Sequence, residues 1–316
     1  MQKQFYKNSL VSIVMNCHNG EHFLNSAIQS ILNQTYSNWE LIFWDNQSTD
    51  NSKNIISSFK DRRIRYYYSQ EFTKLGEARN LAIIKCKGEF ICFLDTDDIW
   101  LKDNIENLIN VFYKINDINF AYNGTIVLDQ RKNKRLIYPL RDYDKVPSGN
   151  MFNYTALNRH ISFGGIMIRK SALLKVIPVP KFLSHSVDDY IILNILLDSI
   201  AIYTRNLTFI YRIHNNNLTH KQLLTASKEA ISIIKILQKV KPDYDFSKIK
   251  EDRYYKLSIY YILKGDFLSF INTFLQCRPL IFCYLLVKTV VRRILRILHF
   301  NKISKSDILK IESLIE

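Results

Sequence analysis

Glycine and proline are scarce in this sequence, with 8 glycines and 6 prolines among 316 residues. Flexible linkers are rich in such residues, so their scarcity argues against loosely joined domains. Long apolar runs are missing too, because no segment has the roughly 20 consecutive apolar residues that a membrane-spanning helix needs. The apolar run LVSIVM, which follows Lys3 and Lys7, is too short for the hydrophobic part of a signal peptide. These absences predict a cytoplasmic protein of one or two domains.

Paired cysteines are also missing. The five cysteines show no CxxC spacing and no Cys/His pattern typical of a zinc site, and their number is odd. Reduced and mostly buried thiols are the interpretation that fits an intracellular chain. These cysteines are Cys17, Cys86, Cys92, Cys277 and Cys283.

Acidic residues are outnumbered by basic ones. The formal net charge is +15, which favours nucleic acid, anionic lipid or phosphorylated compounds as partners. The chain from Lys221 onward carries 18 Lys and Arg against 9 Asp and Glu, and no acidic residue occurs between Asp266 and Asp307. The C-terminal third is therefore the first place to expect contact with a negatively charged surface.

A dense acidic motif is present in the stretch EFICFLDTDDIW. Phe90–Leu94 is an uninterrupted apolar run, typical of a strand buried on both faces, and Asp95, Asp97 and Asp98 follow it. Two like charges about 4 Å apart repel by about 4 kcal/mol at an effective dielectric constant near 20. Holding a divalent cation with oxygen ligands is the simplest reason to keep these carboxylates together. The alternative is a solvated acidic turn in which Asp98 caps the next helix.

Strands and helices alternate at short intervals through the first hundred residues. Apolar runs at residues 10–15, 39–44 and 64–68 predict three strands before the Phe90 strand, with amphipathic helices between them. Such alternation is typical of parallel βαβ units, so we expect an α/β, Rossmann-like, doubly wound mixed sheet. Ligands bind beyond the carboxyl ends of the strands in such sheets. Polar loops follow three of these strands and favour a nucleotide site: Asn16–Asn19, Asp45 with Asn46, and Asp95–Asp98.

The rest of the chain continues this pattern and then becomes helical. Ser48 and Ser52 are predicted to cap the helix after the second strand, and a later helix is predicted to open near Ser186 or Asp188. Strands are expected at residues 119–129 (bent or paired), 161–170 and 201–216. From about Thr219 the periodicity is helical to the end. The predicted organisation is an α/β domain over residues 1–218 and a basic helical extension over residues 219–316.

Four segments, in their order and spacing, resemble those of an inverting family 2 glycosyltransferase with the glycosyltransferase A fold. They are VSIVMNCHNGEHFLNSAIQSILNQTY, the opening strand and helix; WDNQSTDNS, the acidic turn after the second strand; LGEARNLAIIKCKGEFICFLDTDDIW, the arginine-containing helix and the metal-binding DXD strand; and SVDDYIILNIL, the helix start with the catalytic base. The segment YRIHNNNLT also fits. The resemblance covers about two-thirds of the chain and implies that the α/β domain binds a nucleotide-sugar and transfers its sugar.

The resemblance implies that the loops after the first two strands bind the nucleotide. Family members use an aspartate of the acidic turn to accept the imide N–H of uracil or thymine, which makes Asp45 or Asn46 the candidate here. The family's second aspartate is Asn46 in this chain, and an amide both accepts and donates. The family's Pro-Thr-Tyr-Asn loop is replaced by residues 16–19, of which only Asn19 is kept, and His18 is placed to lie against the base. The residues assigned to nucleotide-sugar binding are Cys17, His18, Asn19, Asp45, Asn46, Arg79, Asp95 and Thr96.

The DXD strand and the helix before it are implied to bind the diphosphate and a metal ion. Arg79 is the expected diphosphate ligand, since a guanidinium offers a fork of donors; a surface salt bridge with Glu77 or a neighbour is the alternative. Asp97 is the implied direct metal ligand, and Asp95 is expected to bridge the ribose and a metal-bound water. Asp98 is assigned to capping the next helix rather than to the metal. Mg²⁺ or Mn²⁺ is the expected cofactor, a Lewis acid that offsets charge on the departing nucleoside diphosphate.

Asp189 is the general base implied by the resemblance. It takes the proton from the acceptor hydroxyl while that oxygen attacks the anomeric carbon from the face opposite the leaving group. Asp188 stands where glutamate is common and is expected to orient the acceptor. The alternative for both is a helix cap and a partner of the helix dipole. His214 is expected to contact the diphosphate or the metal, with a core histidine as the alternative.

The C-terminal region suggests contact with a membrane surface. Leu280–Val287 is apolar, but it covers only about 12 Å at 1.5 Å per residue, which is too short to span a bilayer. Lys288, Arg292 and Arg296 follow at four-residue spacing. We therefore expect residues 280–300 to form an interfacial helix on anionic lipid. The alternative is a helix packed on the catalytic domain with a solvated basic edge.

The leading hypothesis is transfer of a sugar from a nucleoside diphosphate donor, with a UDP-sugar favoured, to a saccharide or lipid-linked saccharide in bacterial surface glycan synthesis. A sugar-phosphate nucleotidyltransferase would need a glycine-rich phosphate loop after the first strand, and NCHNGEH holds one glycine. A non-catalytic protein that binds nucleic acid or scaffolds a membrane would interleave basic residues with exposed aromatics. Most aromatics here lie in strand-like runs, so nucleic acid is not an expected partner.

Overall fold

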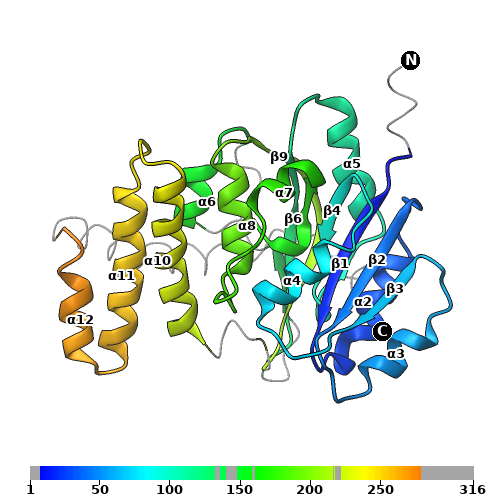
Figure 1. The fold of residues 1–316 in the computed structure, drawn as a ribbon, viewed down its shortest axis with the longest axis horizontal. Helices are drawn as coiled ribbons and strands as arrows, with labels where there is room; N and C mark the ends of the chain where they lie inside the picture. The colour runs from blue at the N-terminus through cyan, green and yellow to red at the C-terminus, as the bar shows by residue number, and fades with distance from the viewer. Residues whose placement is uncertain are drawn as a thin grey trace.

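A computed structural model describes residues 8–131, 136–139, 148–158, 161–215, 217 and 222–278. It contains a mixed sheet with strand order β3-β2-β1-β4-β8-β6-β9-β5, and β7 pairs with β6 (Figure 1). The first four strands in sequence are parallel, as the alternation predicts, and β1 lies between β2 and β4. They are β1 Val11–Cys17, β2 Trp39–Asp45, β3 Ile64–Tyr68 and β4 Phe90–Phe93.

The other half of the sheet reverses direction. β8 is antiparallel to both β4 and β6, whereas β6 and β9 run parallel. The bounds are β5 Ile99–Trp100, β6 Phe120–Asp129, β7 Leu136–Pro139, β8 Ile166–Arg169 and β9 Ala201–Ile213. The strand expected at 161–170 is therefore partly wrong, because Phe163–Gly165 forms a 3-10 turn. A Cβ at Gly164 would lie 2.2 Å from the Phe209 ring, so glycine permits this close approach.

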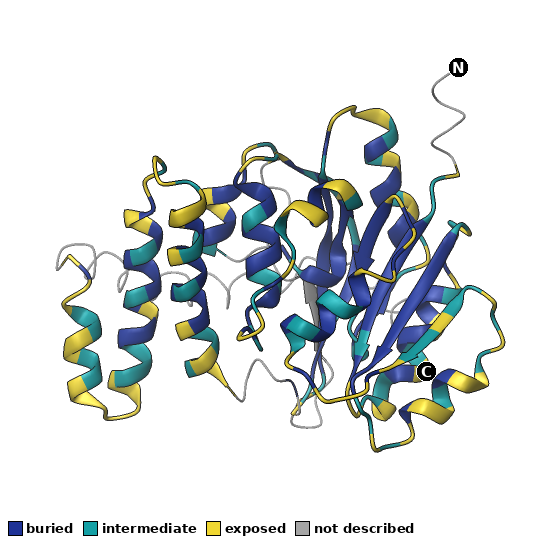
Figure 2. Cartoon of the chain, in the orientation of Figure 1, coloured by how far each residue is buried: buried dark blue, intermediate teal, exposed yellow. Residues whose placement is uncertain are grey.

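Helices cover both faces of the sheet and bury two hydrophobic cores. On one face α2 Glu21–Leu32, α3 Ser52–Ser58 and α5 Asn104–Lys114 pack against the strands. On the other face lie α4 Leu75–Ile83, α6 Phe152–Asn158, α7 Lys170–Val176 and α8 Val187–Leu196. Strands β1, β2 and β4 are buried between these layers (Figure 2). Burial on both faces explains their uninterrupted apolar sequences.

Three further helices extend from the sheet in a row (Figure 1): α10 Leu223–Val240, α11 Ser247–Leu263 and α12 Phe267–Phe274. α10 packs on α8, and α11 packs on α10 and α6. Ile233, Ile234 and Leu237 of α10 belong to the same hydrophobic core as α8. The division into domains 1–218 and 219–316 stays a prediction, and α8 and α10 share one core across that boundary. No helix within the described residues is long and apolar enough to cross a bilayer, and residues 280–300 lie outside them.

The predicted helix caps are wrong at two places. Asp98 does not cap α5, which begins six residues later at Asn104; its carboxylate instead accepts a hydrogen bond from the Arg212 backbone N–H at 2.9 Å. Ser48 and Ser52 do not cap α3. Their hydroxyls accept from the backbone N–H groups of the loop after β1, which fixes that loop against the acidic turn.

Candidate active site

Three carboxylates gather where β4 ends, as the sequence predicts. Asp95, Asp97 and Asp98 each offer an oxygen within 4.8 Å of the others. Asp98 is 3% exposed, and burial together with the charges of Asp97 and Asp95 raises its pKa well above the ordinary value. Desolvation and the neighbouring carboxylates also raise the pKa of Asp95, to about 6, although Arg79 acts in the opposite direction. Converging carboxylate oxygens that repel one another are a donor set that fits Mg²⁺ or Mn²⁺.

His214 and Asn217 come to this cluster from the segment that follows β9. His214 Nε2 lies 3.0 Å from an Asp97 carboxylate oxygen, so the structure brings together the two residues that the sequence placed near a metal. Asn217 Nδ2 donates to the same Asp97 oxygen at 3.2 Å and to the Arg212 carbonyl at 3.1 Å. Asn217 was not among the predicted site residues, although it lies in the YRIHNNNLT segment. A metal contact by His214 stays a prediction.

Arg79 connects the carboxylate cluster to α8. Its side chain is 2% exposed, donates to Asp95 Oδ1 at 3.1 Å and is hydrogen-bonded to Asp188. The guanidinium lies 4.4 Å from the centre of the Phe163 ring. Burial lowers the pKa of Arg79, but the two carboxylates outweigh it and raise the pKa, so the side chain stays charged.

The surface salt bridge expected as the alternative for Arg79 is wrong, because the Arg79 side chain is buried and Glu77 pairs with Lys181 instead. The guanidinium is held between two carboxylates on different elements. Contact between Arg79 and a diphosphate stays a prediction.

Asp188 and Asp189 both lie in the first turn of α8. Burial raises the pKa of Asp188, and Arg79 counteracts this effect. Because Asp188 is bonded to Arg79, it is not a simple helix cap. The carboxylate of Asp189 is 24% exposed and lies 4.0 Å from Nη2 of Arg253, a residue of α11 that carried no recognisable motif. A proton-accepting role for Asp189 stays a prediction.

The acidic turn after β2 is engaged by protein groups. Asp45 is fully buried, and its carboxylate accepts from Ser48 N–H and from the Tyr66 hydroxyl, both at 2.8 Å. Asn46 is 6% exposed, and its amide donates to the Thr73 carbonyl at 2.8 Å and accepts from Thr73 N–H at 3.2 Å. Base contact by either residue stays a prediction, and in this conformation it requires sharing or exchanging these bonds.

The loop after β1 presents His18 beside an aromatic residue. His18 Nδ1 lies 3.0 Å from the Asn46 carbonyl oxygen, and its ring is 4.8 Å from that of Phe72, which is 58% exposed. Asn19 adopts a positive φ of 57° and accepts from Thr49 N–H at 2.8 Å. An exposed aromatic edge next to an imidazole suits a flat ring system. Phe72 lies in a loop without a sequence signal and was missed.

Two other predicted residues, Cys17 and Thr96, pack around this loop. Cys17 is 1% exposed, with Sγ 3.6 Å from the Ser48 hydroxyl, and burial raises the pKa of its thiol. Thr96 packs against Gly20, where an added Cβ would lie 3.0 Å from its hydroxyl.

Both amide atoms of Asn16 are buried without a hydrogen-bond partner among the described residues. This orphaned amide at the carboxyl end of β1 is suited to a polar group of a ligand.

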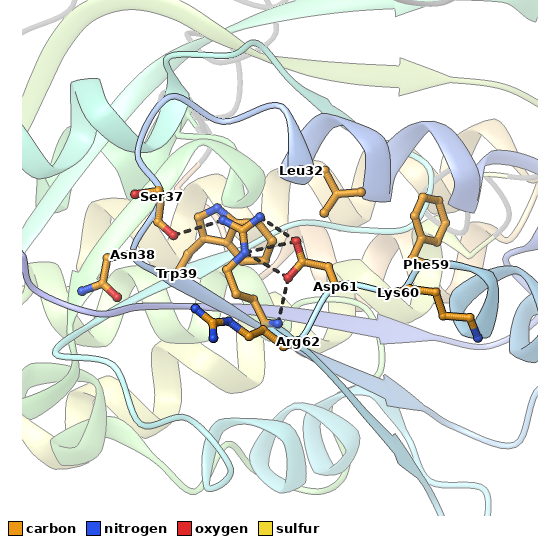
Figure 3. Close-up of a pocket in the computed structure, with 9 residues that line it drawn as sticks. Leu32, Ser37, Asn38, Trp39, Phe59, Lys60, Asp61 and Arg62 are labelled. Carbon is orange, nitrogen blue, oxygen red and sulfur yellow. Dashed lines mark hydrogen bonds and ion pairs between the residues drawn. The ribbon is translucent and has the colours of Figure 1, made fainter.

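A separate hollow lies at the opposite ends of the strands, beside the start of β2 (Figure 3). Arg63 lies 3.7 Å over the Trp39 ring there, and its guanidinium binds Asp61 at 2.6 Å and the Ser37 carbonyl at 3.1 Å. The hollow is formed around an internal ion pair at the amino ends of β2 and β3. It is therefore no part of the site at their carboxyl ends.

The mixed sheet, with polar loops and a carboxylate cluster at its carboxyl edge, agrees with the glycosyltransferase A fold that the sequence predicts. Residues 12–177 match the family model "Glycosyl transferase family 2", and the chain belongs to this family. A relative in Escherichia coli is 32% identical over 191 residues, which are 60% of this chain and 71% of that protein. It is named UDP-Glc:alpha-D-GlcNAc-diphosphoundecaprenol beta-1,3-glucosyltransferase WfgD. Family membership and the enzyme class predicted from the motifs are thus confirmed.

Solved structures confirm the fold. S. aureus TarS in complex with UDP-GlcNAc superimposes with a TM-score of 0.64 at 13% identity, covering 83% of this chain and 79% of that one. The mannosyltransferase PcManGT of Pyrobaculum calidifontis, in complex with GDP-Man and Mn²⁺, gives a TM-score of 0.57 at 14% identity, covering 90% and 80%. At sequence identities this low, the superpositions support the fold alone.

Proposed function

We propose that this chain is an inverting, metal-dependent glycosyltransferase that moves a sugar from a UDP-sugar to a lipid-linked saccharide during assembly of a bacterial surface glycan. The observation that carries the proposal is the row of neighbouring side chains from His214 and Asp97 through Asp95, Arg79 and Asp188 to the first turn of α8. It joins a cation-binding edge and a candidate base in one site. The donor and acceptor in the name of the E. coli relative support these substrate classes.

Different residues are proposed to act on the donor and on the acceptor. Asp97 would hold the cation, with Asp95 and His214 beside it, and a bound cation offsets the negative charge that develops on the departing nucleoside diphosphate. Asp189 accepts the proton of the acceptor hydroxyl as that oxygen attacks the anomeric carbon from the face opposite the diphosphate. That direction of attack inverts the anomeric configuration. Asp98 stays with Arg212 and holds the strand end in place.

Arg79 fixes the distance between the two halves of the site. Its contacts with Asp95 and Asp188 tie the β4 end to the α8 start. Charged, hydrogen-bonded pairs of this kind restrict geometry more than they add stability. Catalysis depends on such placement, because an error of about 1 Å can cost roughly 10²-fold in rate.

Donor turnover tests this proposal directly. UDP-, dTDP- and GDP-sugars should be incubated with the full chain in Mn²⁺, in Mg²⁺ and in EDTA, with release of nucleoside diphosphate as the readout. We expect turnover of a UDP-sugar with added cation and loss of turnover in EDTA, because the carboxylate cluster needs a counter-charge. No turnover of any donor, together with no cation-dependent binding of UDP, would reject the proposed function.

We also propose that the C-terminal region rests on an anionic membrane surface. α12 has no buried residue (Figure 2), and its apolar side chains are largely exposed, including Phe267 at 64%, Leu268 at 73% and Ile271 at 50%. The apolar and basic segment 280–300 follows it in the sequence. An exposed apolar helix next to basic residues suits the interface, where each basic residue contributes about 1 kcal/mol.

Flotation with vesicles tests this association. The full chain should float with vesicles that contain phosphatidylglycerol and stay behind with phosphatidylcholine alone. A variant with Lys288, Arg292 and Arg296 changed to Gln should float several-fold less, and equal flotation of both proteins would contradict the proposal. An exposed triple change on α10, at Lys228, Lys235 and Lys239, removes the same charge elsewhere and serves as the control.

A further inference from the structure

A buried glutamate of α10 holds the backbone that leads into α8. The Glu229 side chain is 6% exposed, and its carboxylate accepts hydrogen bonds from three consecutive backbone N–H groups. The distances are 2.8 Å to Ser184, 3.0 Å to His185 and 2.8 Å to Ser186. The Ser184 hydroxyl adds a fourth bond at 2.8 Å. The segment before α8 is thus fixed from α10 at four points.

This arrangement places a negative charge at the start of the helix that carries Asp188 and Asp189. Consecutive N–H groups form an anion-binding concavity, and the positive end of the helix dipole adds to it. Burial alone would raise the pKa of Glu229, but these hydrogen bonds outweigh it and lower the pKa, so the carboxylate is ionised. Ser186 connects this fixed segment to α8, because its carbonyl accepts the first helical hydrogen bond from Tyr190 N–H at 3.0 Å.

A buried arginine of α11 faces the first turn of α8 itself. Arg253 is 3% exposed, and its Nη2 donates to the Ala156 carbonyl of α6 at 2.7 Å. The same atom lies 4.0 Å from the Asp189 carboxylate. The guanidinium is therefore anchored on α6 while its charge faces Asp189.

Neither residue belongs to the part of the chain that the family model matches, which ends at residue 177. Glu229 acts on the backbone before the α8 turn, and Arg253 acts on a side chain within it. In Figure 1, α10 lies between α8 and α11. The contact of Glu229 therefore comes from α10, and the contact of Arg253 comes from the helix packed on α10. Two buried charges of opposite sign thus act on the start of α8 from the C-terminal helices, Glu229 on the backbone before it and Arg253 on its first turn.

We propose that Glu229 and Arg253 are positioning residues that set the place and orientation of Asp189, and that α10 and α11 are therefore a working part of the active site. This inference rests on the proposed role of Asp189 as the base. A merely structural role for the two charges would change stability and leave the rate of the folded enzyme unaltered.

Glu229→Gln is the first test, because the amide keeps the size of the side chain but turns an NH₂ group toward N–H donors. At a temperature where every variant is folded, we expect kcat to fall by about 10- to 100-fold, with the KM for the donor within about twofold of wild type. Arg253→Gln should do the same, and Arg253→Lys should recover part of the loss by restoring the charge. Thermal unfolding of each variant establishes the folded range.

Glu251→Gln is the matched control. Glu251 is a buried carboxylate of the same helical pair, but it binds Arg278 at 2.5 Å rather than α8. We expect this variant to keep the wild-type kcat. A loss of kcat as large as that of Glu229→Gln would overturn the inference, because it would trace the effect to the stability of the helices.

A double variant separates positioning from general damage. Glu229 is proposed to act through Asp189, so adding Glu229→Gln to Asp189→Asn should lower the residual rate by less than twofold. If the losses of kcat in the two single variants multiply in the double variant, the inference is overturned. A wild-type kcat in both Glu229→Gln and Arg253→Gln would overturn it too, and either result would leave the proposed function intact. A wild-type protein without turnover of any donor would reject the proposed function and, with it, this inference.

Discussion

Asp189→Asn is expected to lower kcat by about 10²–10⁴-fold, the usual contribution of a positioned general base. The amide keeps the shape of the side chain but cannot accept the proton that leaves the acceptor hydroxyl. Binding of the donor should remain, because Asp189 lies on α8 and the carboxylate cluster lies at the end of β4. Steady-state transfer with the preferred donor gives kcat, and titration with UDP in the presence of cation gives the donor affinity.

Asp198→Asn controls for the loss of a carboxylate near the same helix. Asp198 follows α8, its side chain is 71% exposed, and it pairs with Lys241 on the surface. We expect transfer by this variant to match wild type. Wild-type kcat in Asp189→Asn would show that another group takes the proton.

Asp97→Asn is expected to lower kcat/KM by about 10²–10³-fold, because a bound cation contributes several kcal/mol to a developing negative charge. The change removes one charge from the cluster and keeps the contacts with His214 and Asn217 within reach of an amide. Turnover should require much more Mn²⁺, and Mn²⁺ should no longer tighten the binding of UDP. Calorimetric titration of UDP with and without Mn²⁺ measures the second effect.

Asp117→Asn is the control for this experiment, since Asp117 is exposed in the turn after α5 and its positive φ of 60° suits asparagine. It should leave the dependence on Mn²⁺ unchanged. An unaltered dependence in Asp97→Asn would remove Asp97 from the proposed set of metal ligands.

The parallel half of the sheet and the carboxylate cluster could be predicted because their signals are local. Phe90–Leu94 is apolar throughout, and Asp95 and Asp97 come directly after it. Since the carboxyl ends of parallel strands meet at one edge, local patterns also place the loops after β1, β2 and β4 together. The contact between Asp188 and Arg79 was not predicted, because 109 residues separate them and no local pattern links them.

The start of α8 near Ser186 could be predicted from the sequence, but the caps of α3 and α5 could not, because remote side chains bind the backbone near several helix starts. Local rules seek a cap one residue before the helix, which favoured Asp98 and Ser52. At α5 the Ile105 N–H instead donates to the Gln34 side chain at 3.0 Å, and at α8 the preceding backbone is held by Glu229. Such partners have no fixed spacing. In the sequence, Glu229 stands four and eight residues before Ile233 and Leu237. This spacing puts a charged residue on the apolar face of α10, and it is the sequence feature that marked Glu229.

The contacts of Glu229 and Arg253 bear on how such enzymes could be recombined. A chimera joined at residue 218, between α8 and α10, would keep α8 but exchange α10 and α11 for foreign helices. The α8 turn would then meet side chains that were not selected to hold it. The smallest exchangeable module of this enzyme accordingly runs through the end of α11, and tails exchanged between enzymes should be joined between α11 and α12.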